Sequence, residues 1–350
     1  MSRLTSIAQW HERINATIQG SATIYSSSGS TGPGKSLPYT PDVFRGAVKR
    51  TKEVCNLIPI RNTDKVVIMW GYGLFPPAQF YTQALGEMGA LVYPLGSGKN
   101  LSTELKIIRM VDTPPSILVG MPSYLLKVGR DMIASGNLSK ACVNLRCLIT
   151  GGELLSEALR QELIKLFRAP VFDHYGMLQA PMIAGECSFQ RKHISEEYDP
   201  EVLDGTKISS NGKGTLLLSS ETVWPITLRR LQTNDRVRLC RNTCECGSDA
   251  PWIEIFGRTD FVMKIRGQQV DFTALCSNLR DITIAELYFE IIKEPTDRVV
   301  VHIGPSVDEA ILRKALDSQL SFTYEVKTYS TLELPQTNTG KTTQIVIRST

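Results

Sequence analysis

Residues 29–36 form a stretch whose residue types suit phosphate binding. The stretch reads Gly-Ser-Thr-Gly-Pro-Gly-Lys-Ser, which fits the G-x-x-x-x-G-K-S pattern of P-loop nucleoside triphosphatases. Glycines let backbone N–H groups approach phosphate oxygens, the hydroxyl side chains add donors, and Lys35 adds a positive charge. The loop therefore predicts a nucleotide site.

The residues after this loop argue against a triphosphatase. In that class the lysine begins a helix whose amino end holds the phosphates, but here Pro38 and Pro41 follow Lys35 closely. Proline interrupts a helix and pushes the residue before it toward extended geometry. A triphosphatase also needs an apolar strand that ends in an acid, whereas the strands expected at 66–70 and 145–149 are followed by glycine and threonine. A P-loop triphosphatase is therefore the weaker alternative.

The composition is that of an ordinary globular chain. The 350 residues are 42% hydrophobic and 21% charged, and the net charge is +4, which is mild for this length, so no nucleic-acid partner is expected. Residues 1–20 have no apolar core like that of a secretory signal, and no stretch reaches the ~20 apolar residues of a membrane helix. Eight cysteines without such a signal favour reduced thiols and a cytoplasmic location.

Short apolar strands alternate with helical patterns from about residue 65 to 175. Strands are expected at 66–70, 91–94, 116–119 and 147–149, and helices at 78–88, 103–111, 122–133 and 156–167. This alternation is typical of βαβ units, so it predicts a mostly parallel sheet covered by helices.

The pattern then changes twice. Asn211-Gly212 predicts a hairpin turn ahead of a strand at 214–218, and several short strands follow as a β-rich part. After about residue 260, strands at 287–292, 299–303 and 324–330 and a helix at 307–320 predict a small α+β unit. The fold class is therefore α/β, with a large N-terminal domain over 1–258, a small C-terminal domain over 259–350 that carries Lys341, and a hinge at 258–261.

Further motifs follow the loop in a regular order. They are Gly151-Gly152-Glu153, Asp173-His174-Tyr175-Gly176-Met177, Thr233-Asn234-Asp235, Gly257-Arg258-Thr259-Asp260, Lys264-Ile265-Arg266-Gly267, and a Leu-Pro-Gln-Thr-Asn-Thr-Gly-Lys run that ends at Lys341. Together with the loop they resemble the motifs of the adenylate-forming superfamily, over most of the chain. Gly71-Tyr72-Gly73-Leu74-Phe75, Met121-Pro122-Ser123-Tyr124 and Cys244-Glu245-Cys246-Gly247 resemble the phenylacetate–CoA ligase branch in particular.

The resemblance implies a two-step reaction. A carboxylate attacks the α-phosphorus of ATP, pyrophosphate leaves, and the acyl-adenylate passes its acyl group to a thiol, either of coenzyme A or of a carrier protein. Catalysis of this kind depends on placement and electrostatic stabilisation. The loop residues implied to hold the β- and γ-phosphates are Ser27, Ser28, Gly29, Ser30, Thr31, Gly32 and Lys35.

The remaining roles are also implied by the resemblance. Tyr175 would stack on adenine, and the rest of the nucleotide pocket would comprise Gly152, Glu153, Asp173, His174 and Gly176. Asp235 would accept both ribose hydroxyls, with Arg258 nearby. Lys341 would pair with the α-phosphate and carboxylate, and the small domain would then rotate about Asp260. Gly267 would let the pantetheine arm pass close to the backbone, and Lys264 precedes it among the cofactor-binding residues.

Four side chains could bind a metal ion. Cys187, His193, Cys244 and Cys246 form a set that tetrahedral zinc accepts, and the resembling branch carries these positions. The alternative is that they are reduced core cysteines. Such a zinc would be structural and would hold the 187–193 loop beside the adenine pocket.

The chain departs from the family pattern in three places. Gln179 stands where relatives have a glutamate that helps to hold Mg²⁺, and a neutral amide is a poorer ligand for that ion. Glu153 or Glu186 could compensate. The loop ends Pro33-Gly34-Lys35 where Pro-Lys is usual. About 25 residues precede the loop, fewer than in relatives, which suggests a surface that a homodimer or a partner protein could cover.

These observations predict an acid–thiol ligase with ATP, Mg²⁺ and a small carboxylic acid as its ligands. The acid is expected to be aromatic or apolar, because apolar and aromatic residues lie near the presumed acyl site: Tyr72, Phe75, Phe80, Tyr81 and Met121. One alternative is an enzyme that stops at adenylation or passes the acyl group to a protein cysteine. Another, suggested by Gln179, is a nucleotide-binding protein without catalysis.

Overall fold

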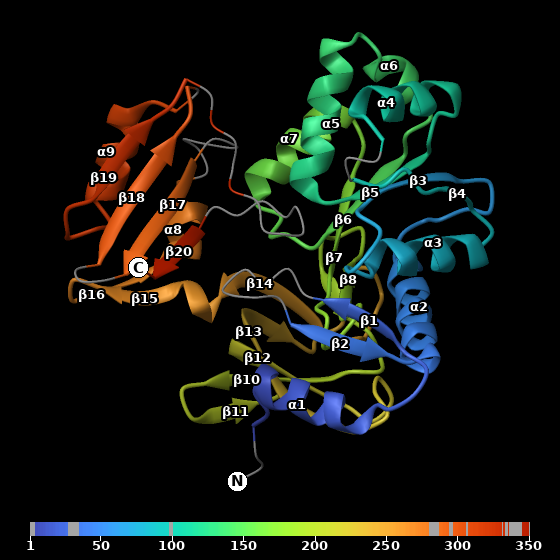
Figure 1. Cartoon of the computed structure of the whole chain (residues 1–350), viewed down its shortest axis with the longest axis horizontal. Coiled ribbons are helices and arrows are strands. Elements are labelled where there is room, and N and C mark those ends of the chain that lie inside the picture. Colours follow the sequence, from blue (N-terminus) through green and yellow to red (C-terminus); the bar gives the residue numbers. More distant parts are fainter. Residues whose placement is uncertain are drawn as a thin grey trace.

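Twelve strands of the chain form one mixed sheet (Figure 1). The computed structural model describes residues 4–26, 35–97, 101–279, 287–293, 297–305, 307–330, 332, 335 and 345–349. The strand order of the sheet is β11-β10-β12-β13-β14-β9-β8-β7-β6-β5-β3-β4. Its parallel part comprises β4 (Leu91–Tyr93), β3 (Lys65–Met69), β5 (Ile117–Gly120), β6 (Cys147–Gly151) and β7 (Val171–Tyr175).

Helices cover both faces of the parallel part. One face carries α2 (Pro41–Cys55) and α3 (Pro77–Glu87), and the other carries α4 (Thr103–Asp112), α5 (Pro122–Ala134), α6 (Leu138–Ala141) and α7 (Glu157–Phe167). Successive strand side chains point to opposite faces. Val66 and Ile68 of β3 accordingly join the core beneath α2 and α3, whereas Val67 and Met69 join the core beneath α4 to α7. The predicted βαβ units and helix-covered parallel sheet are therefore present.

The amino-terminal part forms a short helix and a hairpin. Helix α1 (Ile7–Thr17) begins with a capping box of Ser6 and Gln9, and β1 (Thr23–Ser26) pairs antiparallel with β2 (Ser36–Tyr39). Lys35 therefore precedes a strand. Because a triphosphatase lysine begins a helix, the triphosphatase alternative is wrong.

The antiparallel part of the sheet corrects one predicted turn. It comprises β8 (Ala184–Glu186), β9 (Lys192–Ile194), β10 (Asp199–Asp204), β11 (Lys207–Ser209), β12 (Gly212–Ser220), β13 (Leu228–Cys240) and β14 (Trp252–Arg258). The hairpin turn expected at Asn211-Gly212 is wrong, because β10 lies between β11 and β12. The tight turn lies instead at Gly205, which has a φ of 58° and joins the paired strands β10 and β11.

The last part of the chain forms its own small sheet and core. After the 3₁₀ turn η1 (Thr259–Phe261) come β15 (Val262–Ile265), β16 (Gln268–Asp271), α8 (Phe272–Asn278), β17 (Leu287–Lys293), β18 (Arg298–Ile303), α9 (Glu309–Asp317), β19 (Glu325–Thr328) and β20 (Ile345–Ser349). The sheet order is β19-β18-β17-β20. The predicted α+β content is present, although β20 was not predicted. The domain boundary at 258/259 stays a prediction.

Two contacts join α8 to the large sheet. Arg236 of β13 forms an ion pair with Asp271, the N-cap residue of α8. Gly257 of β14 lies so close to Thr273 that a Cβ at this glycine would be 2.2 Å from Thr273 Cγ2. Among the described helices, none is both long and apolar enough to span a bilayer.

We expect the substitution Gly151→Ala to destabilise the fold. An added Cβ at Gly151 of β6 would lie 2.6 Å from the carbonyl oxygen of His174 on the neighbouring strand β7, and backbone cannot easily move aside. Such overpacking costs about 1–3 kcal/mol. Gly86→Ala is the matched control, because Gly86 lies in α3 with open space around it and alanine favours a helix. Urea unfolding of both variants tests this, and equal free energies of unfolding would contradict it.

Candidate active site

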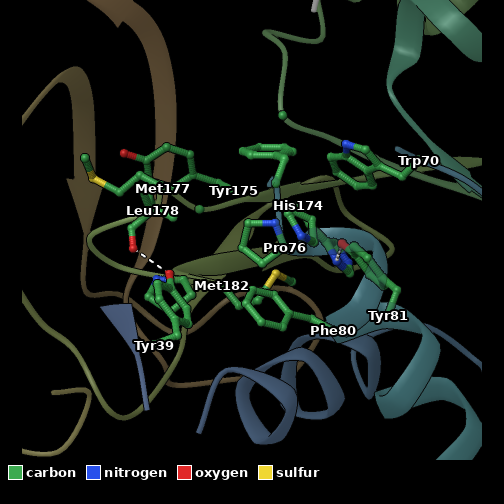
Figure 2. A pocket seen from close by; sticks show the side chains of 15 residues that line it. Tyr39, Trp70, Pro76, Phe80, Tyr81, His174, Tyr175, Met177, Leu178 and Met182 are labelled. Carbon is green, nitrogen blue, oxygen red and sulfur yellow. Dashed lines mark hydrogen bonds between the residues drawn. The ribbon is translucent and has the colours of Figure 1, made fainter. Parts of the chain in front are cut away.

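An apolar pocket lies at the carboxyl ends of β6 and β7, next to the start of α3 (Figure 2). Its lining comprises Tyr39, Trp70, Phe75, Pro76, Pro77, Phe80, Tyr81, Gly152, His174, Tyr175, Gly176, Met177, Leu178, Pro181 and Met182. Of the residues expected near an acyl site, Phe75, Phe80 and Tyr81 are in this lining, whereas Tyr72 and Met121 are not. Aromatic and aliphatic side chains therefore dominate the pocket, as binding pockets for organic ligands typically require.

Tyr175 connects this pocket to a polar site on β13. The Tyr175 hydroxyl donates a hydrogen bond to Oδ2 of Asp235, which is 8% exposed. Thr233 Oγ1 accepts the backbone N–H of Asp235 at 3.1 Å within strand β13. Burial raises the pKa of Tyr175 well above its usual value, so its hydroxyl stays protonated. The structure thus brings together two residues that are 60 positions apart in sequence.

Arg258 forms an ion pair with the other carboxylate oxygen of Asp235. Its guanidinium lies 3.4 Å from Asp235 Oδ1 and binds Asp260 Oδ2 through Nε at 3.1 Å and Nη2 at 2.5 Å. Asn234 Nδ2 also donates to Asp260, at 3.4 Å. The residues predicted to hold ribose and to form the hinge therefore make one connected network.

The Gly-Gly-Glu motif lies where β6 leads toward α7. Gly152 has a φ of 79°, which glycine adopts without strain, and it lines the pocket. Glu153 Oε2 accepts the backbone N–H of Ser123 at 3.2 Å, so its carboxylate sits at the amino end of α5, where a negative charge is favoured. Gly176 also lines the pocket, and a Cβ there would meet Met182 N at 2.7 Å.

Asp173 belongs to a buried cluster of charged side chains between the sheet and helix α7. Its carboxylate binds Thr150 Oγ1 at 2.8 Å and Lys192 Nζ at 3.1 Å, and burial raises its pKa. Glu186 pairs with Lys192 at 2.7 Å and takes both terminal nitrogens of Arg160, at 2.7 and 3.0 Å. Asp173 is outside the lining of the apolar pocket, because side chains alternate along β7 and His174 takes the pocket side.

Gln179 is held by a histidine that the sequence did not single out. Its side-chain amide Nε2 lies 2.5 Å from Nε2 of His11 on α1, and its backbone oxygen accepts the Trp224 indole N–H at 2.7 Å. Burial and the nearby charge of Lys35 lower the pKa of His11, so the imidazole is neutral and can accept the amide N–H. No sequence motif surrounds His11. Its contact with Gln179 is evident only in the tertiary structure, where α1 packs against Trp224.

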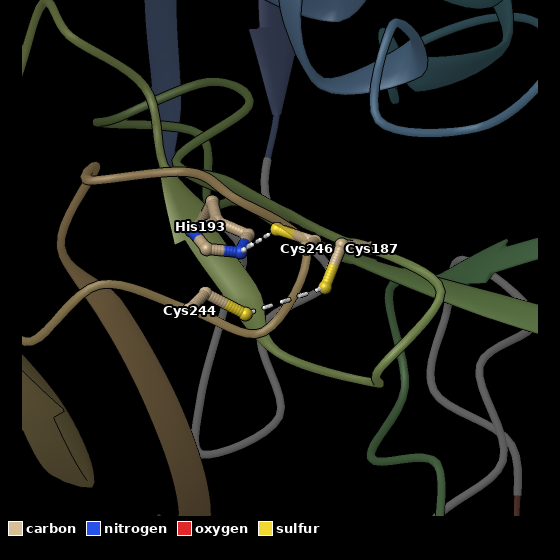
Figure 3. A group of neighbouring side chains, drawn as sticks. All are labelled: Cys187, His193, Cys244 and Cys246. Atoms are coloured by element: carbon tan, nitrogen blue, oxygen red, sulfur yellow. Dashed lines mark hydrogen bonds between the residues drawn. The ribbon is translucent and has the colours of Figure 1, made fainter.

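The four predicted metal ligands converge (Figure 3). The ligand atoms of Cys187, His193, Cys244 and Cys246 all lie within 4.8 Å of one another. Cys187 Sγ is 3.9 Å from Cys244 Sγ, and Cys246 Sγ is 3.3 Å from His193 Nε2. His193 Nδ1 lies 3.2 Å from the carbonyl oxygen of Ala250 and can donate to it, which leaves Nε2 as the ligand atom.

Other predicted site residues are not part of these groups. Ser27, Ser28, Gly29, Ser30, Thr31, Gly32 and Lys341 lie outside the described residues. Lys264 is exposed on β15, and Gly267 has a φ of 91° in the turn between β15 and β16. Their predicted roles stay predictions.

The fold is that of the adenylate-forming enzymes. The structure of a 2-hydroxyisobutyryl-CoA ligase in its postadenylation state superposes with a TM-score of 0.80 at 16% identity, over 99% of this chain and 80% of that one. ATP-bound MatB from Rhodopseudomonas palustris gives a TM-score of 0.68 at 18% identity, over 95% and 68% of the two chains. An anthranilate CoA ligase with anthranoyl-AMP gives 0.64 at 17% identity, over 91% and 65%. The predicted α/β fold class is confirmed.

Sequence comparison narrows the resemblance. The chain is 28% identical to a phenylacetate–coenzyme A ligase of Escherichia coli over 259 residues, which are 71% of this chain and 57% of the ligase. It is 26% identical to the enzyme of Pseudomonas putida over 274 residues, 76% of this chain and 61% of that one. The chain thus spans about three fifths of the length of these relatives. No protein-family model matches the sequence. The predicted resemblance to phenylacetate–CoA ligases is confirmed.

We expect His174 to make the fold sensitive to acid. Burial lowers the pKa of His174 to about 4, whereas an unfolded histidine titrates near 6.5. Between these pH values the unfolded chain binds a proton that the folded chain excludes. The contribution of the neutral His174 to the free energy of unfolding is therefore complete above pH 6.5 and is lost as pH falls toward 4. His174→Gln should reduce the slope of unfolding free energy against pH by up to about 1.4 kcal/mol per pH unit.

Urea unfolding of the wild type and His174→Gln at several pH values between 7 and 4.5 measures this slope. Burial also lowers the pKa values of His11 and His193, so part of the acid sensitivity should persist in the variant. Equal slopes of unfolding free energy against pH for the two proteins would contradict the prediction, because they would show that burial does not lower the pKa of His174.

Proposed function

We propose that this protein joins a carboxylic acid to ATP as an acyl-adenylate and transfers the acyl group to the thiol of coenzyme A. The observation that carries the proposal is the continuity between an apolar pocket and the Tyr175–Asp235–Arg258 network. The pocket suits the apolar body of an acid, and the network suits a nucleotide. The reacting carboxylate would then lie between them, near Tyr175, which belongs to both.

In this proposal the nucleotide replaces internal hydrogen bonds of the network. Tyr175 offers its ring to adenine, and Asp235 offers two oxygens to the ribose hydroxyls. In the structure, one of these oxygens accepts the Tyr175 hydroxyl and the other faces Arg258. Ribose binding would exchange these partners for the ribose hydroxyls, so each carboxylate oxygen keeps a partner. The carboxylate oxygen of the acid attacks the α-phosphorus and pyrophosphate leaves. The thiol sulfur then attacks the acyl carbon and AMP leaves.

The remaining predicted roles complete the proposal. The 27–32 loop and Lys35 hold the outer phosphates, and Lys341 stabilises the charge at the α-phosphate. Asp260 is the hinge, and Lys264 and Gly267 belong to the part that receives the pantetheine arm. A carrier-protein pantetheine is the alternative acceptor. A homodimer stays a prediction.

Position 179 offers Mg²⁺ an amide, because the residue there is glutamine and not glutamate. The amide is neutral and its nitrogen faces His11. The two glutamates that could compensate are engaged elsewhere: Glu153 accepts the Ser123 N–H, and Glu186 is paired with Arg160 and Lys192. This disagreement favours a second candidate function, a relative that binds the nucleotide without adenylating an acid.

Zinc, in contrast, fits its proposed ligands. Tetrahedral zinc with bonds of about 2.0–2.3 Å holds its ligand atoms roughly 3.3–3.8 Å apart, close to the separations of 3.3 and 3.9 Å between the two contacting pairs. All four ligands come from protein, so no position is left for substrate, and the proposed role is structural. The ion would tie the turn before β9 to the loop before β14.

The adenylation proposal predicts pyrophosphate release from ATP with an aromatic or apolar acid. Lys341→Ala should lower kcat by about 100-fold, because it removes a positive charge from the developing phosphate charge. Asp235→Ala should raise the KM for ATP by about 10-fold or more, because a charged hydrogen-bond acceptor is lost. Asp204→Ala, at the exposed end of β10, is the control and should change neither.

A panel of aromatic and aliphatic acids with coupled pyrophosphate detection measures these effects. ATP binding without pyrophosphate release for any acid would contradict the ligase and support the nucleotide-binding candidate.

The zinc proposal predicts about one zinc ion per chain in protein purified without chelators. Cys244→Ser should lose the metal and lower the free energy of unfolding by at least about 2 kcal/mol, because a ligand bound only by the folded state stabilises it. Cys142→Ser, outside the cluster, should keep the metal. Elemental analysis measures the zinc content, and thermal unfolding measures the stability of each protein. A wild type that contains no metal and is no more stable than Cys244→Ser would refute the zinc site.

A further inference from the structure

The indole of Trp70, in the pocket wall, has a nitrogen without a partner among the described residues. Trp70 follows β3 directly and is 3% exposed, and its indole Nε1 is buried with no hydrogen-bond partner among the described residues. An indole N–H can only donate. A buried donor without an acceptor costs free energy in the empty protein, and a ligand that brings an acceptor recovers it.

Packing holds this indole in place. Trp70 stacks on Tyr81 with ring centroids 5.7 Å apart, and it is tilted against Phe75 at 6.5 Å. A Cβ on Gly151 would lie 3.2 Å from Trp70 Cη2, so the ring also crosses the end of β6 closely. The Tyr81 hydroxyl is already bonded to His174 Nδ1 at 2.7 Å. Figure 2 shows Trp70 and Tyr81 on the same wall of the pocket.

Among the described residues, two other buried ring nitrogens lack partners: Nε2 of His174, which also lines the pocket, and Nε1 of Trp10. His174 Nε2 would be 3.2 Å from a Cβ at Gly185, and Val54 Cβ lies 2.7 Å from that same point. The His174 nitrogen is therefore enclosed between β8 and α2. Trp10 Nε1 is also unpaired, but Trp10 is outside the pocket lining. Of the two indoles that lack a partner among the described residues, only Trp70 lines the pocket.

We propose that Trp70 is a specificity-determining residue and that the acid carries a hydrogen-bond acceptor on its apolar or aromatic body. The acceptor, such as a ring hydroxyl or carbonyl oxygen, receives the indole N–H. The proposal rests on the proposed function, because it takes the pocket as the acyl site. A single donor in an apolar wall discriminates strongly, since an acid without the acceptor leaves the donor unpaired.

The test compares acids that differ only in the acceptor. The 2-, 3- and 4-hydroxyphenylacetates are paired with the corresponding methylphenylacetates, which have nearly the same shape, and each dissociation constant is measured by calorimetry. At least one hydroxy acid should bind about 10- to 100-fold more tightly than its methyl partner. In Trp70→Phe this preference should nearly disappear. Trp10→Phe removes an unpaired indole elsewhere and should keep the preference.

A second readout observes the donor directly. The chain has four tryptophans, so the indole N–H signals can be assigned with Trp70→Phe. The preferred hydroxy acid should move the Trp70 N–H signal downfield relative to its methyl partner, and the other three signals should respond alike to both acids. Equal binding within every pair, a preference that survives Trp70→Phe, or no binding of any of the six acids would overturn the proposal.

Pyrophosphate release measured in the same samples separates this inference from the ligase function. A hydroxyl preference in binding without pyrophosphate release would remove the ligase function and leave the donor role intact. Equal binding and equal turnover of paired acids would remove the donor role and leave the ligase function.

Discussion

A buried cluster of charges between β7, β8, β9 and α7 is the interaction on which the site depends most. Arg160, Asp173, Glu186 and Lys192 neutralise one another there, within hydrogen-bonding distance. Removing one member of such a group leaves an uncompensated buried charge, which typically costs about 3–5 kcal/mol. The cluster lies where the parallel part of the sheet passes into the antiparallel part, so it fixes the geometry of that junction.

Each strand residue of this cluster precedes a residue of another group. Asp173 precedes His174 in the pocket, Glu186 precedes Cys187, and Lys192 precedes His193. Because side chains alternate along a strand, charges that are locked on one face hold their neighbours on the other. The apolar pocket and the cysteine–histidine group therefore share one buried support. Damage to the cluster should disturb both together.

The nucleotide end of the site is organised differently, by exchangeable contacts. Asp235 is buried, Arg258 and Asp260 are partly exposed, and the three bind one another through charged hydrogen bonds. Partners of this kind can be replaced by polar groups of a substrate at little cost, because a hydrogen bond is exchanged and not lost. Gln179 contrasts with them, since its side chain faces the neutral His11 and has no charged partner among the hydrogen bonds of the described residues.

The sequence by itself determined the α/β order of elements, the motif positions and the four possible zinc ligands. These follow from local patterns: apolar periodicity sets strands and helices, and glycines mark turns. Only the tertiary structure decided that Asn211-Gly212 is not a hairpin, because strand order depends on which strands pair across the sheet. It alone joined His11 to Gln179, left Trp70 Nε1 without a partner in the described part of the chain, and added β20. Those outcomes depend on contacts between distant residues, which no local pattern encodes.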